Sequence, residues 1–113
     1  MTIKKRAENE LRRYSVWKST MEGLTDQLEK EKDNIRELRA ARASFYHKCR
    51  RVERALDTLT DHQRRILELF YINRCEDHIG ILCEEMFIEP ASVYRKKDDA
   101  LKDYILAAFG IEV

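Results

Sequence analysis

Residues that form turns are scarce in this chain of 113 residues, which has three glycines and one proline. Because glycine and proline mark most turns and helix ends, their scarcity excludes a fold with many tight turns. Charged residues make up 38% of the chain, well above the usual quarter. Together these two features predict an all-α fold with at least one long helix that is heavily exposed to solvent.

Long apolar runs are also absent. No run approaches the roughly 18 residues that are needed to span a bilayer. The basic start at Lys4, Lys5 and Arg6 is not followed by the apolar segment of a signal peptide. The three cysteines, an odd number, fit reduced thiols better than a disulfide framework. We therefore expect a cytoplasmic protein that does not contact a membrane.

Motifs for catalysis and for cofactor binding are missing. The chain has no Gly-rich phosphate loop, no His-Glu zinc motif and no nucleophile elbow. Its cysteines and histidines do not form the closely spaced cysteine pairs that are typical of zinc sites. We therefore expect that the protein is not an enzyme and that it has no catalytic residue, cofactor, metal site or small-molecule substrate.

Residues 1–58 carry a heptad repeat. Thirteen of sixteen positions are apolar in two series, which are Ala7, Tyr14, Met21, Leu28, Ile35, Arg42, Cys49 and Leu56, and Glu10, Trp17, Leu24, Glu31, Leu38, Phe45, Val52 and Leu59. A repeat of 3.5 residues sustained over this length predicts a coiled-coil seam, within one chain or between two. Residues 1–58 are therefore expected to be a helical coiled-coil or dimerisation arm.

Two architectures satisfy this repeat. One continuous helix would be roughly 80 Å long and would need a partner chain to bury its seam. A helical hairpin would need a break, for which the candidates are Gly23–Thr25 and Ala40–Ser44, where Thr25 or Ser44 would cap the second helix. The heptad pattern favours a homodimer formed through this arm.

Residues 59–113 have a different pattern. Thr60 and Gln63 match a capping box at the start of a helix, and Asp77 is a suitable cap for the next one. Pro90 favours the first turn of a last helix that ends near Phe109, before Gly110. The residues expected to face inward are Ile66, Leu67, Phe70, Tyr71, Ile79, Leu82, Cys83, Met86, Val93, Ala100, Leu101, Tyr104, Ile105 and Ala108. The fold predicted for this half is a trihelical helix-turn-helix domain.

In a helix-turn-helix, the second helix of the pair enters the major groove of DNA. Here that helix is residues 90–109. Arg95 is suited to a bidentate pair of bonds with guanine, Lys96 or Lys97 to phosphate, and Ser92 to a phosphate oxygen. Arg64 and Arg65, in the helix that starts after Thr60, can add to the same basic face. The predicted DNA-binding residues are therefore Ser92, Tyr94, Arg95, Lys96, Lys97, Arg64 and Arg65.

Residues 59–110 resemble sigma-factor region 4 and the ArpU/RinA-like phage regulators that share this domain. The resemblance rests on the run from Leu59 to Ile72, on Ile81-Leu82-Cys83, on Ile88, on Ser92-Val93-Tyr94-Arg95 and on Ala100-Leu101. It covers under half of the chain. It implies a DNA-binding transcriptional regulator encoded by a phage or prophage.

Three positions depart from the family pattern. Phe87 stands where the family has the turn glycine, whose backbone is left-handed. A bulky residue is unfavourable there, so we expect the turn to be rebuilt locally. Glu89 replaces the usual capping serine, and Ile81 replaces an acidic residue.

Charge is divided unevenly along the chain. Residues 1–59 have 15 basic and 10 acidic side chains, whereas residues 60–113 have 7 and 11. A DNA-binding domain usually has a basic surplus, although affinity depends on local neutralisation of phosphates, to which Lys48, Arg50, Arg51 and Arg54 add charge. The acidic surplus leaves open a module that docks on RNA polymerase or another protein. A packaging protein like the small terminase subunits is less favoured, because those usually place the DNA-binding domain first.

Overall fold

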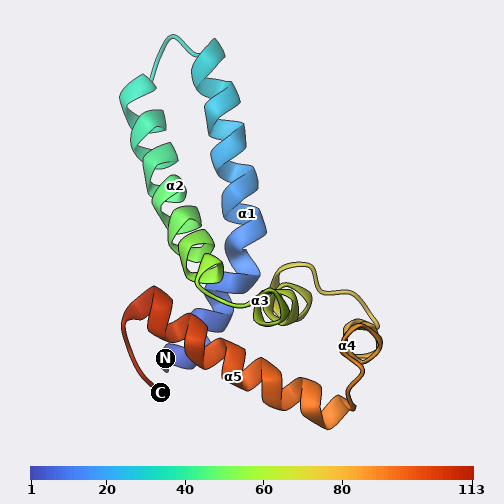
Figure 1. The fold of residues 1–113 in the computed structure, drawn as a ribbon. Helices are drawn as coiled ribbons and strands as arrows, with labels where there is room; N and C mark the ends of the chain where they lie inside the picture. The colour runs from blue at the N-terminus through green and yellow to red at the C-terminus, as the bar shows by residue number, and fades with distance from the viewer.

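The computed structural model describes all 113 residues, and the predicted all-α fold is confirmed. Figure 1 shows a long two-helix hairpin that stands on a base of shorter segments and one long helix. In chain order the elements are α1 (Ile3–Lys30), α2 (Ile35–Asp57), α3 (Asp61–Leu67), the π-helix η1 (Glu68–Ile72), α4 (His78–Met86) and α5 (Pro90–Phe109).

The hairpin settles the two architectures left open by the heptad repeat. α1 and α2 run side by side and are joined by a short turn over residues 31–34, in which Asn34 has the left-handed φ of 59°. Both breaks proposed from the sequence are wrong, because Gly23–Thr25 lies within α1 and Ala40–Ser44 within α2. Thr25 does not cap a helix, since its hydroxyl donates to the Met21 carbonyl at 3.0 Å within α1. Asparagine tolerates the left-handed region well, which suits Asn34 to the turn.

All sixteen heptad positions are buried or half-buried, as the repeat predicts. The seam closes within one chain, so its burial requires no partner chain, and the homodimer stays a prediction. Glu10, a polar residue in the seam, is 7% exposed and bonds to Arg51 of α2. Burial raises the pKa of Glu10, although the nearby Arg51 guanidinium opposes the shift.

The base of the hairpin shares one core with the C-terminal helices. Leu11 of α1 is fully buried, and Tyr71 of η1 donates to Glu8 of α1 at 2.9 Å. α5 lies across the foot of the hairpin, and the two chain ends lie near each other beside it (Figure 1). The largest side chains fully buried in this core come from all five α-helices: Leu11, Cys49, Val52, Ile66, Leu67, Leu82, Val93, Leu101, Tyr104 and Ile105.

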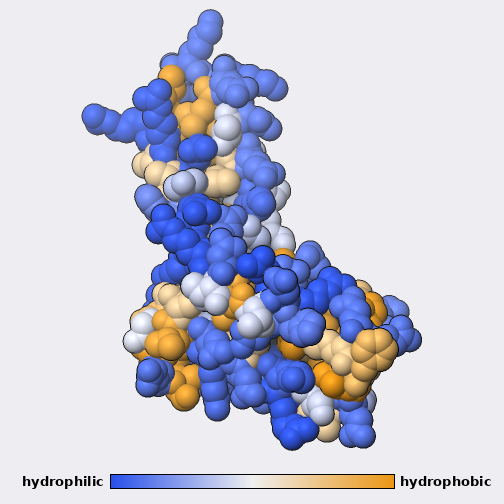
Figure 2. Space-filling view, in the orientation of Figure 1, coloured by the Kyte–Doolittle hydropathy of each residue, from blue (hydrophilic) through white to orange (hydrophobic).

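The hairpin makes the molecule elongated, with extents of 55 × 30 × 24 Å. The radius of gyration is 16.6 Å, against about 13 Å for a compact chain of this length. Nowhere in the fold is there a helix with the length and apolar character needed to cross a membrane. Polar colour covers most of the face seen in Figure 2, with apolar patches near the hairpin tip and at the two ends of the base.

Candidate nucleic-acid interface

The first helix of the C-terminal half begins as the sequence predicts. Thr60 accepts from the Gln63 backbone N–H at 3.2 Å, and the Gln63 side chain accepts from the Thr60 N–H at 3.0 Å, which completes the capping box. The amide nitrogen of Gln63 also donates to Asp103 of α5 at 2.6 Å. The cap therefore fixes the start of α3 and joins it to α5.

The π-helix η1 was not predicted, although two of its residues, Phe70 and Tyr71, were expected in the core. Its wide turn is closed by a bond of 2.7 Å from the Asn73 N–H to the Glu68 carbonyl. Three consecutive residues, Leu69, Phe70 and Tyr71, are buried as a result. Phe70 then supports both helices that follow, because its ring packs in T-shaped geometry against His78 in α4 and Tyr94 in α5. The distances between ring centres are 4.9 Å and 5.9 Å.

Three residues, Phe87 to Glu89, connect α4 to α5, as expected for a helix-turn-helix. The expectation that the turn is rebuilt around Phe87 is wrong, because Phe87 takes the left-handed conformation itself, with φ 55° and ψ 46°. Its side chain is 92% exposed, so the bulky ring meets no neighbour that would force another conformation. Glu89 precedes α5 without a side-chain capping bond, and Pro90 occupies the first turn.

Replacing Phe87 with glycine is expected to stabilise the fold by about 1 kcal/mol. The left-handed conformation costs a residue with a Cβ about 1–2 kcal/mol, which exceeds the entropic cost of a glycine. Little packing is lost, since the ring is exposed. Urea unfolding would measure the change. Asn34→Gly is the matched control, at another left-handed position, where we expect a smaller gain because asparagine tolerates this region. A loss of stability in Phe87→Gly would show that the ring makes a stabilising contact.

The first turns of α5 carry an open polar groove of about 400 Å³. Four side chains line it: Ser92, Arg95, Lys96 and Asp99. The guanidinium of Arg95 donates to the Ser92 hydroxyl at 3.0 Å, which holds it along the helix surface. Lys96 is exposed and has no ion pair. Three predicted site residues are thus brought together, on the half of α5 that extends away from the hairpin (Figure 1).

Asp99 is the groove residue that the predicted site omits. The signal was available in the sequence, because Asp99 follows Lys96 by three residues and Arg95 by four, so the side chains share a helix face. The four side chains combine two cations, a hydroxyl and one carboxylate.

Tyr94 and Lys97 lie outside this groove. Lys97 has only 16% of its side chain exposed, where its ammonium pairs with Asp98 at 2.9 Å and lies 5.6 Å from the centre of the Phe70 ring. This ammonium lowers the pKa of Asp98. Tyr94 is half exposed and rests its ring edge on Phe70. Both side chains therefore hold α5 against η1.

Arg64 and Arg65 of α3 also bond within the chain. Arg64 donates to the Leu56 carbonyl at 3.3 Å and to Asp57 at 3.4 Å, so it faces α2. Arg65 makes a bidentate pair with Glu85 of α4, at 3.0 and 2.8 Å, which lowers the pKa of Glu85. Neither arginine lines the groove, so the predicted seven-residue site divides into three groove residues and four residues that join helices.

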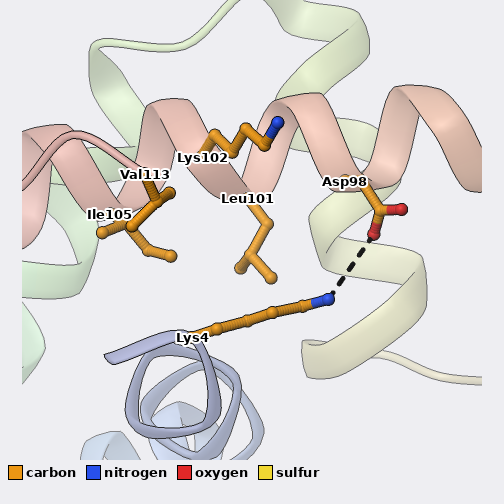
Figure 3. A pocket seen from close by; sticks show the side chains of 6 residues that line it. All are labelled: Lys4, Asp98, Leu101, Lys102, Ile105 and Val113. Atoms are coloured by element: carbon orange, nitrogen blue, oxygen red, sulfur yellow. Dashed lines mark ion pairs between the residues drawn. The ribbon is translucent and has the colours of Figure 1, made fainter. Parts of the chain in front are cut away.

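A second groove, of about 250 Å³, lies on a different face of α5. Figure 3 shows the Lys4 side chain passing beneath Leu101 toward Asp98, with a separation of 4.0 Å between ammonium and carboxylate. Ile105 and Val113 form its apolar end, and Lys102 completes the lining. This groove is the joint between the first turn of α1 and α5, and the Lys4 ammonium is already paired with Asp98.

Comparisons with protein-family models, with curated proteins and with solved structures found no match to this chain.

Proposed function

We propose that this protein is a DNA-binding transcriptional regulator that inserts the first turns of α5 into the major groove. The observation that carries the proposal is the exposed groove of Ser92, Arg95, Lys96 and Asp99 on the second helix of a helix-turn-helix. Residues near the start of such a helix contact base edges, and they can reach them only if the surface is uncovered.

Each groove side chain has a chemical role in this proposal. Arg95 gives a bidentate pair of donors to the acceptors of guanine, and Lys96 bonds a phosphate. Ser92 holds Arg95 in place and can itself donate to a phosphate oxygen. Asp99 can accept from the amino group of cytosine, and its charge repels phosphate at other positions. The groove therefore favours particular bases over indiscriminate binding.

Fluorescence anisotropy with mixed-sequence duplex DNA, at two salt concentrations, tests the proposal. Association should weaken steeply as salt rises, because each neutralised phosphate releases counterions. A selection for preferred sites among the bound duplexes would then define the sequence. Failure to bind any duplex at low salt would reject the proposal.

Replacing Asp99 with asparagine is expected to raise affinity for non-specific DNA about fivefold. An exposed carboxylate near a phosphate costs about 1 kcal/mol of repulsion, and the amide removes that charge with little change of shape. The same anisotropy titration measures the gain. Asp26→Asn, which removes an exposed carboxylate from α1 in the hairpin, is the control and should change affinity little. Equal gains in the two variants would show that only net charge matters.

A protein-docking function is the second candidate, and one surface favours it. Phe87 is 92% exposed in the turn, and the carboxylates of Glu84, Glu85 and Glu89 are exposed near it. An exposed aromatic ring among acids suits a basic, apolar protein surface such as a partner in transcription. Salt-insensitive DNA association, together with loss of partner binding in Phe87→Ala, would favour this candidate.

A further inference from the structure

A basic groove lies between the C-terminal half of α2 and the last turns of α5. Its volume is about 490 Å³, and its lining contains no carboxylate: Tyr46, His47, Arg50, Arg51, Arg54 and Ala107. Tyr46 and Arg54 are exposed, and the other arginines are half-exposed. The lining is therefore a concentration of cationic and hydrogen-bond-donating groups.

The positive charge of this groove is only partly neutralised by carboxylates of the same chain. Arg50 pairs with Glu53 at 3.1 Å and keeps 38% of its side chain exposed. Arg51 bonds to the buried Glu10 and stacks over the Phe109 ring at 5.2 Å, so it is fixed in place. Arg54 has no ion pair. An anion that enters the groove would thus meet held guanidinium groups, with at least one positive charge uncompensated.

The groove shares a face of α5 with the candidate DNA-contacting groove. Ala107 follows Ser92 by fifteen residues and Lys96 by eleven, spacings that return to the same side of an α-helix. The two ends of this stripe are about 22 Å apart at 1.5 Å per residue. Figure 1 shows that α2 ends above the C-terminal part of α5, while the N-terminal part of α5 extends away from the hairpin.

The dimensions of DNA determine where the last turns of α5 lie relative to the duplex. α5 is about 30 Å long, whereas the major groove is about 12 Å wide. If the first turns of α5 enter the groove with the helix axis at an angle to it, the last turns lie beside the sugar-phosphate backbone. Asp99 and Asp103 lie between the two basic ends, so the ends are the parts suited to phosphate.

We propose that the basic groove of α2 binds backbone phosphates of the same DNA duplex that α5 enters, so that the hairpin arm is itself part of the DNA interface. This inference rests on the proposed function. Arg54 and Arg50 donate to phosphate oxygens, Arg51 adds a fixed charge, and the Tyr46 hydroxyl supplies a further donor. The contacts carry no base specificity and add affinity for any sequence.

The test measures the affinity of the full-length protein for a duplex of about 25 base pairs over a series of salt concentrations. Arg50→Ala/Arg54→Ala removes two groove cations and leaves the Arg51–Glu10 pair intact. Arg36→Ala/Arg39→Ala is the matched control, since both arginines are exposed on the same helix without ion pairs and the net charge is the same. Circular dichroism confirms that each variant is folded.

We expect the groove variant to bind about tenfold or more weakly than the control, and equally so for all sequences. The slope of log affinity against log salt should fall by about 1.8, because each lost phosphate contact contributes about 0.9. Equal affinities and slopes in the two variants would overturn the inference.

The Arg95→Ala/Lys96→Ala variant, measured in the same series, separates this inference from the proposed function. Loss of binding there but not in the groove variant leaves the function standing and rejects the α2 contact. Loss in the groove variant alone supports the α2 contact and rejects entry by α5. Absence of DNA binding in the unaltered protein rejects both.

Discussion

The Arg95→Ala/Lys96→Ala double variant is expected to lose between one and three orders of magnitude in affinity for its preferred DNA site. A bidentate contact from arginine to guanine is worth about 1–3 kcal/mol of discrimination, and a lysine–phosphate contact adds a salt-dependent part. The two side chains lie together in one exposed groove, and neither pairs with a carboxylate. The double variant should therefore lose both sequence preference and affinity.

Anisotropy titrations with a preferred duplex and with a scrambled one would measure these losses separately. Arg36→Ala/Arg39→Ala removes the same charge from the far end of the hairpin and should preserve the preference. If the two double variants weakened binding equally for both duplexes, α5 would not be the recognition helix. The fold itself should be unaffected, because Arg95 and Lys96 are exposed.

Leu11→Ala is expected to lower the free energy of unfolding by about 2–5 kcal/mol, the usual range for a buried leucine. Leu11 is fully buried in α1 but is not a position of the heptad seam. It follows Glu8 by three residues, so it lies on the face of α1 that contacts Tyr71 of η1. A cavity there would open between the hairpin and the C-terminal helices. The whole chain should therefore be destabilised together, although Leu11 belongs to the N-terminal arm.

Urea unfolding followed by the fluorescence of Trp17 and by circular dichroism would test this. Trp17 is the only tryptophan and is buried in α1, so it reports on the hairpin, while circular dichroism reports on all helices. Both signals should shift to the same lower midpoint. Leu106→Ala, at a position that is 45% exposed, is the control and should change stability by less than about 0.5 kcal/mol. A shift in the fluorescence midpoint alone would mean that the arm unfolds independently.

Local chemistry accounts for what the sequence predicted correctly. The capping box of Thr60 and Gln63, the first-turn Pro90 and the stop at Gly110 depend on neighbours within a few residues. The heptad positions and the inward face of α5 follow from helical periodicity, and Val93, Ala100, Leu101, Tyr104 and Ile105 are indeed buried. The all-α fold and the exposure of Arg95 and Lys96 were therefore available from the sequence alone.

The tertiary structure decided what periodicity leaves open. A heptad seam does not determine whether the helix that it packs against belongs to the same chain or to another. The turn at residues 31–34 has no glycine or proline to mark it in the sequence. The pairing of Arg65 with Glu85 and the packing of Lys97 over Phe70 each depend on side chains that are distant in sequence. For the same reason, only the packing of α2 against α5 could place a basic groove beside the last turns of α5, the helix that is expected to contact DNA.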